Sequence, residues 1–204
     1  MNPRKHIGLV DDDPAFLRAL QRLLRSAGYD VRAWSSPADF FEENQAESPD
    51  CLVVDMDMPG MSGLEFQKAL AEMDPGLPVV FLTGKGDIPM TVRAMQHGAV
   101  NFLTKPVAED ELFPAIEAAL ETASRNQEHR LRSAAAREGY NSLTPREKEV
   151  LTHLITGKLN KQIAGDLGTS EQTIKVHRMR VLQKMGVRSL PELVHLANLL
   201  AIKA

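Results

Sequence analysis

The first 122 residues alternate short apolar runs with longer segments in which apolar residues recur every third or fourth position. The short runs lie at 7–10, 29–34, 51–54, 79–82 and 100–103, the second of them alternating with charged residues, and the longer segments begin at 14, 36, 63, 88 and 109. Short apolar runs are typical of strands buried in a parallel sheet, and the longer period is that of an amphipathic helix. Five strands alternating with five helices predict an α/β domain over residues 1–122, built on a doubly wound five-stranded parallel sheet.

Polar residues follow four of these apolar runs. Asp11 and Asp12 come after the first run, Asp55 after the third, Thr83 after the fourth and Lys105 after the fifth. Right-handed crossovers place the carboxyl ends of parallel strands at one edge of the sheet, so these side chains should meet there. Three carboxylates would repel one another unless a divalent cation joined them, and Mg²⁺ prefers such oxygen ligands. A hydroxyl and an ammonium group beside the cation would suit a phosphoryl group carried by Asp55.

Residues 142–204 show helical periodicity only. Thr144, Pro145 and Glu147 predict a capped helix start, and further helices are expected from 161, with Asn160 as the cap, and from 170 and 190. A short turn with Gly168 joins the second and third helices, as in a helix-turn-helix. We therefore expect a second, smaller all-α four-helix domain. Residues 123–141 have no apolar stripe and predict a linker that is helical in part and then flexible.

The helix after this turn has an apolar face and a basic face. Its apolar residues are Ile174, Val181, Leu182 and Met185, and its outward residues are Lys175, His177, Arg178, Arg180 and Lys184. A basic helix after a short turn fits the major groove of DNA, where cations meet phosphates and a few side chains read base edges. A solvated basic face is the simpler alternative.

Charge is distributed unevenly along the chain. Residues 1–120 hold 10 Lys and Arg against 19 Asp and Glu, whereas residues 121–204 hold 14 against 8. This split favours a cation or phosphate task for the first part and a polyanion task for the second. The single cysteine, Cys51, excludes a disulfide framework, and no apolar run is long enough for a membrane span. We expect a cytoplasmic protein that does not bind membranes.

Taken together, these motifs resemble the response regulators of two-component signalling. The Asp11-Asp12 pair, Asp55 in D-M-D-M-P-G-M-S-G, Thr83 and Lys105-Pro106 occur in the order of a receiver domain. Residues 142–204 resemble the LuxR-type helix-turn-helix of the NarL/FixJ class through L-T-P-R-E-K-E-V-L, N-K-Q-I-A and T-I-K-V-H-R-M-R-V-L-Q-K-M. The segment G-D-I-P-M-T-V is similar to the FixJ/StyR-like subgroup.

The resemblance implies specific roles for the receiver residues. Asp55 would be the phosphoacceptor, with Thr83 and Lys105 beside it and Thr83 and Phe102 as switch residues. Mg²⁺ would be held by Asp12, Asp55, the backbone carbonyl of Asp57 and, through water, Asp11. The Lys105-Pro106 peptide bond would be cis.

The resemblance also implies DNA contacts and partners. Lys175, Val176 and Met179 would face bases, with Thr173, His177, Arg178 and Arg180 on or near the backbone; relatives often carry a polar residue in place of Met179. The implied partners are a sensor histidine kinase, promoter DNA, RNA polymerase as a further candidate, and a second copy of the chain after phosphorylation. Met90, Val92 and Met95 are candidates for the face between copies. No enzymatic activity beyond turnover of the Asp55 phosphate is expected.

Two alternatives remain at the level of sequence. Asp55-Met56-Asp57 is also a D-x-D, the nucleophile and acid/base pair of haloacid-dehalogenase-type phosphohydrolases. Those enzymes place the motif after the first strand, whereas here it follows the third. A constitutive DNA-binding protein with an inert receiver is disfavoured because every phosphorylation residue is present.

Overall fold

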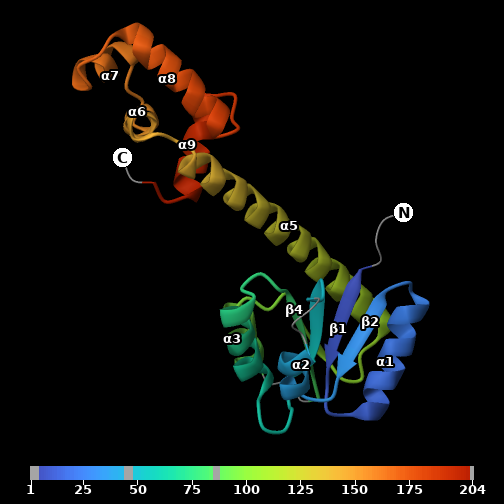
Figure 1. Cartoon of the computed structure of the whole chain (residues 1–204). Helices are drawn as coiled ribbons and strands as arrows, with labels where there is room; N and C mark the ends of the chain where they lie inside the picture. Colours follow the sequence, from blue (N-terminus) through green and yellow to red (C-terminus); the bar gives the residue numbers. More distant parts are fainter. Residues whose placement is uncertain (1–4, 44–47, 85–87, 203–204) are drawn as a thin grey trace. The chain divides into compact units, whose positions relative to one another are not determined.

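The computed structural model describes residues 5–43, 48–84 and 88–202, and the chain divides into two compact units, Met1–Gln127 and Glu128–Ala204 (Figure 1). The first unit is an α/β domain and the second is helical. Among the described residues, none of the helices combines the length and the apolarity that a membrane crossing requires.

The first unit is the predicted doubly wound sheet. Its elements are β1 (His6–Val10), α1 (Pro14–Ser26), β2 (Asp30–Trp34), α2 (Pro37–Glu43), β3 (Cys51–Asp55), α3 (Gly63–Met73), β4 (Val79–Thr83), α4 (Ile88–Gln96), β5 (Asn101–Thr104) and the start of α5 (Glu109–Asn141). All strand pairs are parallel, in the order β2-β1-β3-β4-β5. The five-stranded parallel fold is therefore confirmed.

Helices cover both faces of this sheet, because alternate strand residues point to opposite sides. Ile7, Leu9 and Val53 pack with residues of α1 and α5 on one face. Val10 and Val54, their neighbours in sequence, pack with residues of α2, α3 and α4 on the other face. Every residue of β3 and of β4 is buried, as the continuous apolar runs predicted.

The loop after β3 is held close to the sheet at Gly63. The Gly63 N–H donates to the carbonyl of Met56 at 3.0 Å, and a Cβ at Gly63 would lie 3.0 Å from the Met56 Cα. A larger residue would therefore displace the segment that follows Asp55. Ser62 and Glu65 form a capping box that begins α3 at this point.

The linker at 123–141, expected to be helical in part, is helical throughout. Helix α5 runs without interruption from Glu109 to Asn141. Residues 115–138 contain neither glycine nor proline and are dominated by Ala, Glu and Arg, which favour helix without requiring an apolar stripe. The division between the two units falls inside this helix, after Gln127.

Within residues 128–202, the second unit contains the end of α5 and four further helices: α6 (Pro145–Ile155), α7 (Asn160–Asp166), α8 (Glu171–Lys184) and α9 (Leu190–Leu199). Its core is formed by apolar residues from each of them, including Leu151, Ile163, Ile174 and Leu193. Gly168 takes a positive φ of 60° in the turn between α7 and α8, and Ser170 caps α8 by accepting the Thr173 N–H. The predicted helix-turn-helix is confirmed.

The start of α7 differs in one detail from the sequence prediction. Asn160 is the first helical residue and Leu159 is the N-cap. The Leu159 side chain has no hydrogen-bonding atom, so the cap relies on Gln162, whose Oε1 accepts the Leu159 N–H at 2.8 Å.

Candidate functional site

Three carboxylates converge at the carboxyl ends of β1 and β3. Oxygen atoms of Asp11, Asp12 and Asp55 all lie within 4.8 Å of one another. The register that pairs Val10 with Val54 sets Asp11 and Asp55 at the same level of adjacent strands. Asp11 and Asp55 are buried, whereas Asp12 is exposed. The three carboxylates therefore meet at one edge of the sheet, as the strand-end pattern predicted, and two of them are buried while the third is exposed.

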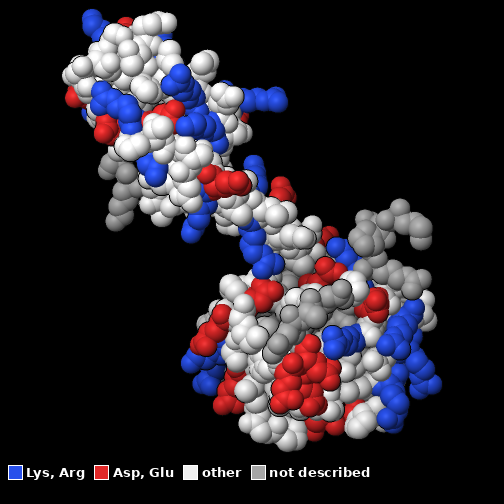
Figure 2. Space-filling view, in the orientation of Figure 1, with Lys and Arg blue, Asp and Glu red and all other residues white. Residues whose placement is uncertain are grey.

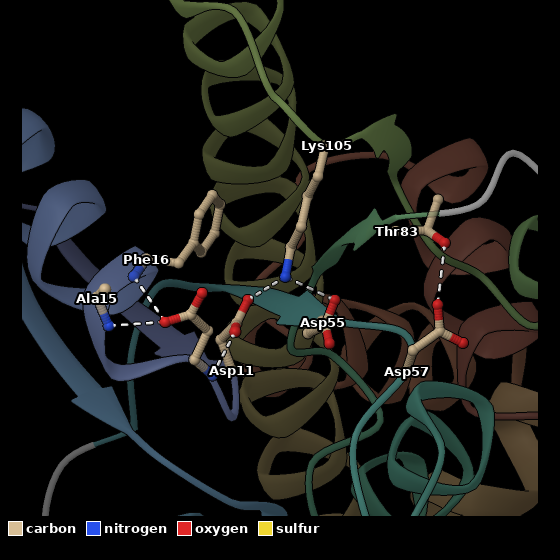
Figure 3. Close-up of polar contacts among 8 residues, drawn as sticks. Asp11, Ala15, Phe16, Asp55, Asp57, Thr83 and Lys105 are labelled. Carbon is tan, nitrogen blue, oxygen red and sulfur yellow. Dashed lines mark hydrogen bonds and ion pairs between the residues drawn. The ribbon is translucent and has the colours of Figure 1, made fainter.

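Lys105 completes this cluster from the end of β5 (Figure 3). Its Nζ lies 2.6 Å from Asp11 Oδ2 and 2.9 Å from Asp55 Oδ1, and its side chain is 22% exposed. The Lys105 N–H donates to the Thr83 carbonyl at 2.7 Å, and the Lys105-Pro106 bond is cis, as the resemblance implied. The ammonium group thus sits between the two buried acids.

The pKa values of Asp11 and Lys105 are both raised, but for different reasons. Burial raises the pKa of Asp11, and hydrogen bonds from Lys105 and from the Asp13 N–H oppose that rise only in part. Desolvation alone would lower the pKa of Lys105, but its hydrogen bonds and attraction to Asp11 and Asp55 outweigh it and raise the pKa. Lys105 therefore stays charged at neutral pH.

Thr83 and Phe102 lie outside this ionic cluster. The Thr83 hydroxyl, at the end of β4, donates to Asp57 Oδ2 at 3.4 Å (Figure 3). Asp57 is exposed, and its side chain is not one of the three converging carboxylates. Phe102 on β5 pairs in register with Phe81 and packs, partly buried, on the core below α3 and α4.

One neighbour of the site was missed by the sequence analysis. Lys105 Nζ lies 4.4 Å from the ring centroid of Phe16. Phe16 lies in the first turn of α1, and its partly buried side chain packs against the core between α1, α5 and the sheet. Nothing in a helical period indicates that the same ring also faces an ammonium group from the far end of the domain.

The basic face of α8 is the second candidate surface, and Figure 2 shows Lys and Arg along this helix. Thr173, Lys175, Met179 and Arg180 are exposed, and Val176, His177 and Arg178 are half-buried. Met179 is 60% exposed. All seven predicted DNA-contacting residues therefore reach the surface of one helix, and Lys175 also lies 3.4 Å from Glu171 one turn earlier.

Lys184 is exposed, as the sequence predicted, but its ammonium group is paired with a buried carboxylate. Its Nζ lies 2.7 Å from the buried carboxylate of Glu147 on α6 and 3.0 Å from the Ser142 carbonyl. An amphipathic pattern cannot reveal this role, because the buried partner of Lys184 comes from another helix.

Comparison with known proteins agrees with this arrangement. Residues 7–117 match the response regulator receiver domain, and residues 141–197 match the bacterial regulatory proteins of the luxR family. The chain is 41% identical to nodulation protein W of Bradyrhizobium diazoefficiens over 196 residues, which cover 96% of this chain and 86% of that protein. It is 40% identical to the transcriptional regulatory protein FixJ of the same organism over 199 residues, covering 97% and 96%.

Solved structures give the same result over the whole chain. The response regulator StyR has a TM-score of 0.79 at 46% identity, with coverage of 96% of this chain and 98% of that one. Full-length FixJ from B. japonicum has a TM-score of 0.59 at 37% identity and covers 98% of both chains. The chain therefore belongs to the two-component response regulators of the NarL/FixJ class, which join a receiver domain to a LuxR-type DNA-binding domain.

Proposed function

We propose that this response regulator is controlled by phosphorylation of Asp55 and that a sensor histidine kinase supplies the phosphoryl group. The observation that carries the proposal is the position of the Asp55 carboxylate, 2.9 Å from the Lys105 ammonium and within 4.8 Å of Asp11 and Asp12. An Asp55 oxygen attacks phosphorus, the P–N bond of the kinase phosphohistidine breaks, and the leaving imidazole takes up a proton. Lys105 stabilises the negative charge on the phosphoryl oxygens.

The acidic cluster fits a magnesium ion. Three carboxylates face one ammonium group, so negative charge is in excess, and all available ligands are hard oxygens. Asp11, Asp12 and Asp55, with the backbone carbonyl of Asp57, would hold Mg²⁺, which supplies charge neutralisation at the phosphoryl group. Asp12→Asn, a change at the exposed member, should weaken Mg²⁺ binding in calorimetric titration.

Phosphorylation would be transmitted through Thr83 and Phe102. The new charge of about −1.5 to −2 attracts the Thr83 hydroxyl away from Asp57, and Phe102 follows it. This changes the face of α4 and β5, where Val92 and Met95 are 48% and 45% exposed. The Met90 side chain lies outside the described residues. Self-association through this face would present two α8 helices to paired half-sites.

The proposed output is promoter binding by the domain at 142–204, joined through residues 123–141 to the receiver at 1–122. Lys175, Val176 and Met179 would contact bases, and Thr173, His177, Arg178 and Arg180 the backbone. RNA polymerase is a further proposed partner, and a cytoplasmic location follows from access to kinase and promoter. The only catalysis in this scheme is formation and loss of the Asp55 phosphate.

Phosphorylation by a small donor tests the acceptor directly. The full chain should be labelled by phosphoramidate with Mg²⁺, and Asp55→Asn should abolish the labelling on a phosphate-affinity gel. Asp57→Asn is the matched control, because it removes a neighbouring carboxylate and should leave labelling in place. Persistent label in Asp55→Asn would contradict the proposal. Rapid turnover of small phosphate esters that requires Asp57 would instead support the D-x-D phosphohydrolase.

A further inference from the structure

The ring of Phe16 lies against the ammonium group of Lys105 (Figure 3). Nζ sits over the ring, 4.4 Å from its centroid, and is also bonded to Asp11 Oδ2 and Asp55 Oδ1. An ammonium group has three N–H bonds, so the two carboxylates leave one side of the cation for the negative face of the ring. Phe16 is therefore a third partner of the lysine that faces the phosphorylation site.

Hydrogen bonds fix this ring relative to the acidic cluster. Asp13 Oδ1 accepts the N–H groups of Phe16, at 3.2 Å, and of Ala15, at 2.8 Å. The Asp13 N–H in turn donates to Asp11 Oδ1 at 2.9 Å. The turn that carries Asp11 thus also sets the first turn of α1, where Phe16 lies. The Phe16 side chain is also partly buried and packs against the core on this face of the sheet.

We infer that Phe16 is a positioning residue for phosphorylation of Asp55, an inference that rests on the function proposed above. When Asp55 becomes an acyl phosphate, its carboxylate loses its charge and the ammonium group must shift from Asp55 to a phosphoryl oxygen. A carboxylate binds the cation at one point, whereas a ring face attracts it over a broad area and excludes water from that side. Phe16 keeps Lys105 directed at the site while one of its anionic partners is consumed.

Fluorination of the ring separates this role from packing. The full chain would carry mono-, di- and trifluorophenylalanine at position 16, and its phosphorylation by phosphoramidate with Mg²⁺ would be followed on a phosphate-affinity gel. Fluorine withdraws electron density from the ring face but keeps the ring's shape. The rate constant should fall stepwise, by about threefold to tenfold in total. Phe16→Leu should show a similar loss, and Phe16→Tyr should retain the rate.

Two controls make the outcome specific to Lys105. In a Lys105→Met background, fluorination should not change the residual rate. In the unmodified chain, the ε-methylene protons of Lys105 should show an upfield ring-current shift in NMR spectra, and Phe16→Leu should abolish it.

The outcomes distinguish this inference from the proposal on which it rests. Rates that do not depend on fluorination, or that fall equally in Lys105→Met, would overturn the role of Phe16, as would the absence of the ring-current shift. If Asp55→Asn abolishes labelling in the same assay, phosphorylation of Asp55 stands in either case. If Asp55→Asn is labelled like the unmodified chain, the proposed function itself fails.

Discussion

Glu147 is a buried carboxylate that serves two helices. Its Oε2 accepts the Thr144 N–H at 2.9 Å, which caps α6, and the Lys184 ammonium at 2.7 Å, which belongs to α8. The hydrogen bond from Lys184, with a smaller effect of the Thr144 N–H, lowers the pKa of Glu147 to about 2. One side chain therefore ties the first helix of the DNA-binding unit to the helix that carries the basic face.

This pKa predicts an acid-dependent loss of stability. The unfolded carboxylate takes up a proton near pH 4.5 and the folded one near pH 2, so the stabilisation is complete above about pH 5 and disappears toward pH 2. Glu147→Gln should therefore lower the free energy of unfolding by on the order of 2–3 kcal/mol at pH 7 and by almost nothing near pH 2. Urea titrations followed through amide NMR resonances of α6 and α8 measure the difference.

Glu149→Gln is the matched control for this change. Glu149 lies on the same helix and 2.7 Å from Arg146, but the two side chains are 51% and 38% exposed. An exposed pair of this kind should contribute less than about 0.5 kcal/mol at any pH. An equal effect of the two substitutions would show that burial of Glu147 is not what makes its ion pair stabilising.

Residue identities predict the acidic cluster better than they predict its surroundings. Asp11, Asp55 and Lys105 were predicted together because strand ends meet at one edge of a parallel sheet whatever the details of packing. The contact of Phe16 with Lys105 was not predicted, because it depends on the orientation that the Asp13 cap gives to the first turn of α1. The same applies to Thr83, whose hydroxyl reaches Asp57 through a side-chain rotation that no spacing encodes.

Among the elements, α5 departs most from what the sequence pattern indicated. Strands and amphipathic helices were predictable because burial imposes a period on them. The middle of α5 has exposed side chains on most sides, so its helical state follows from residue propensity and leaves no period to detect. Its last turns are different, since Gly139 and Ala136 are buried within the second unit. Packing therefore fixes both ends of α5, the first against the sheet and the last within the second unit, but not its middle.

Gly139→Ala tests the packing of that end. Alanine favours helix over glycine by about 1 kcal/mol, but a Cβ at Gly139 would lie 2.6 Å from the Lys184 carbonyl oxygen and 3.2 Å from the Met185 Cα. Because both atoms are backbone, the clash should prevail, and the second unit should lose about 1–3 kcal/mol of unfolding free energy. Thermal unfolding of the full chain, followed through α8 amide resonances, measures this loss.

Gly165→Ala gives the comparison on α7. This glycine also lies within a helix, but apart from its chain neighbours and the backbone of its own helix no heavy atom lies within 4 Å of the position that its Cβ would take. The substitution should leave the second unit as stable as before or stabilise it by up to about 1 kcal/mol. If both alanines stabilised the unit, the contact between α5 and α8 would not limit residue size at position 139.

At the scale of the whole molecule, the two units carry opposite charge. Residues 1–120 have a net charge of −9 and residues 121–204 one of +6. The acidic part holds the carboxylate cluster that we propose to bind Mg²⁺ and the phosphoryl group, and the basic part holds the face of α8. An acidic receiver does not attract DNA, so the affinity for DNA must come from the basic faces of α8. The affinity should therefore increase with the number of copies whose α8 helices bind the same DNA.

The salt dependence of DNA binding should therefore report activation. Each phosphate contact adds about −0.9 to the slope of log affinity against log salt, so two copies bound together should give about twice the slope of one. With a duplex selected from a random pool, anisotropy titrations across a salt series should show the steeper slope only for chain treated with phosphoramidate and Mg²⁺. Asp55→Asn should keep the shallow slope, and Arg180→Ala, which removes a proposed backbone contact, should reduce the steepness of the slope by about one per bound copy. If treatment raised affinity at an unchanged slope, phosphorylation would strengthen the binding of single copies instead of recruiting a second basic helix to the same DNA.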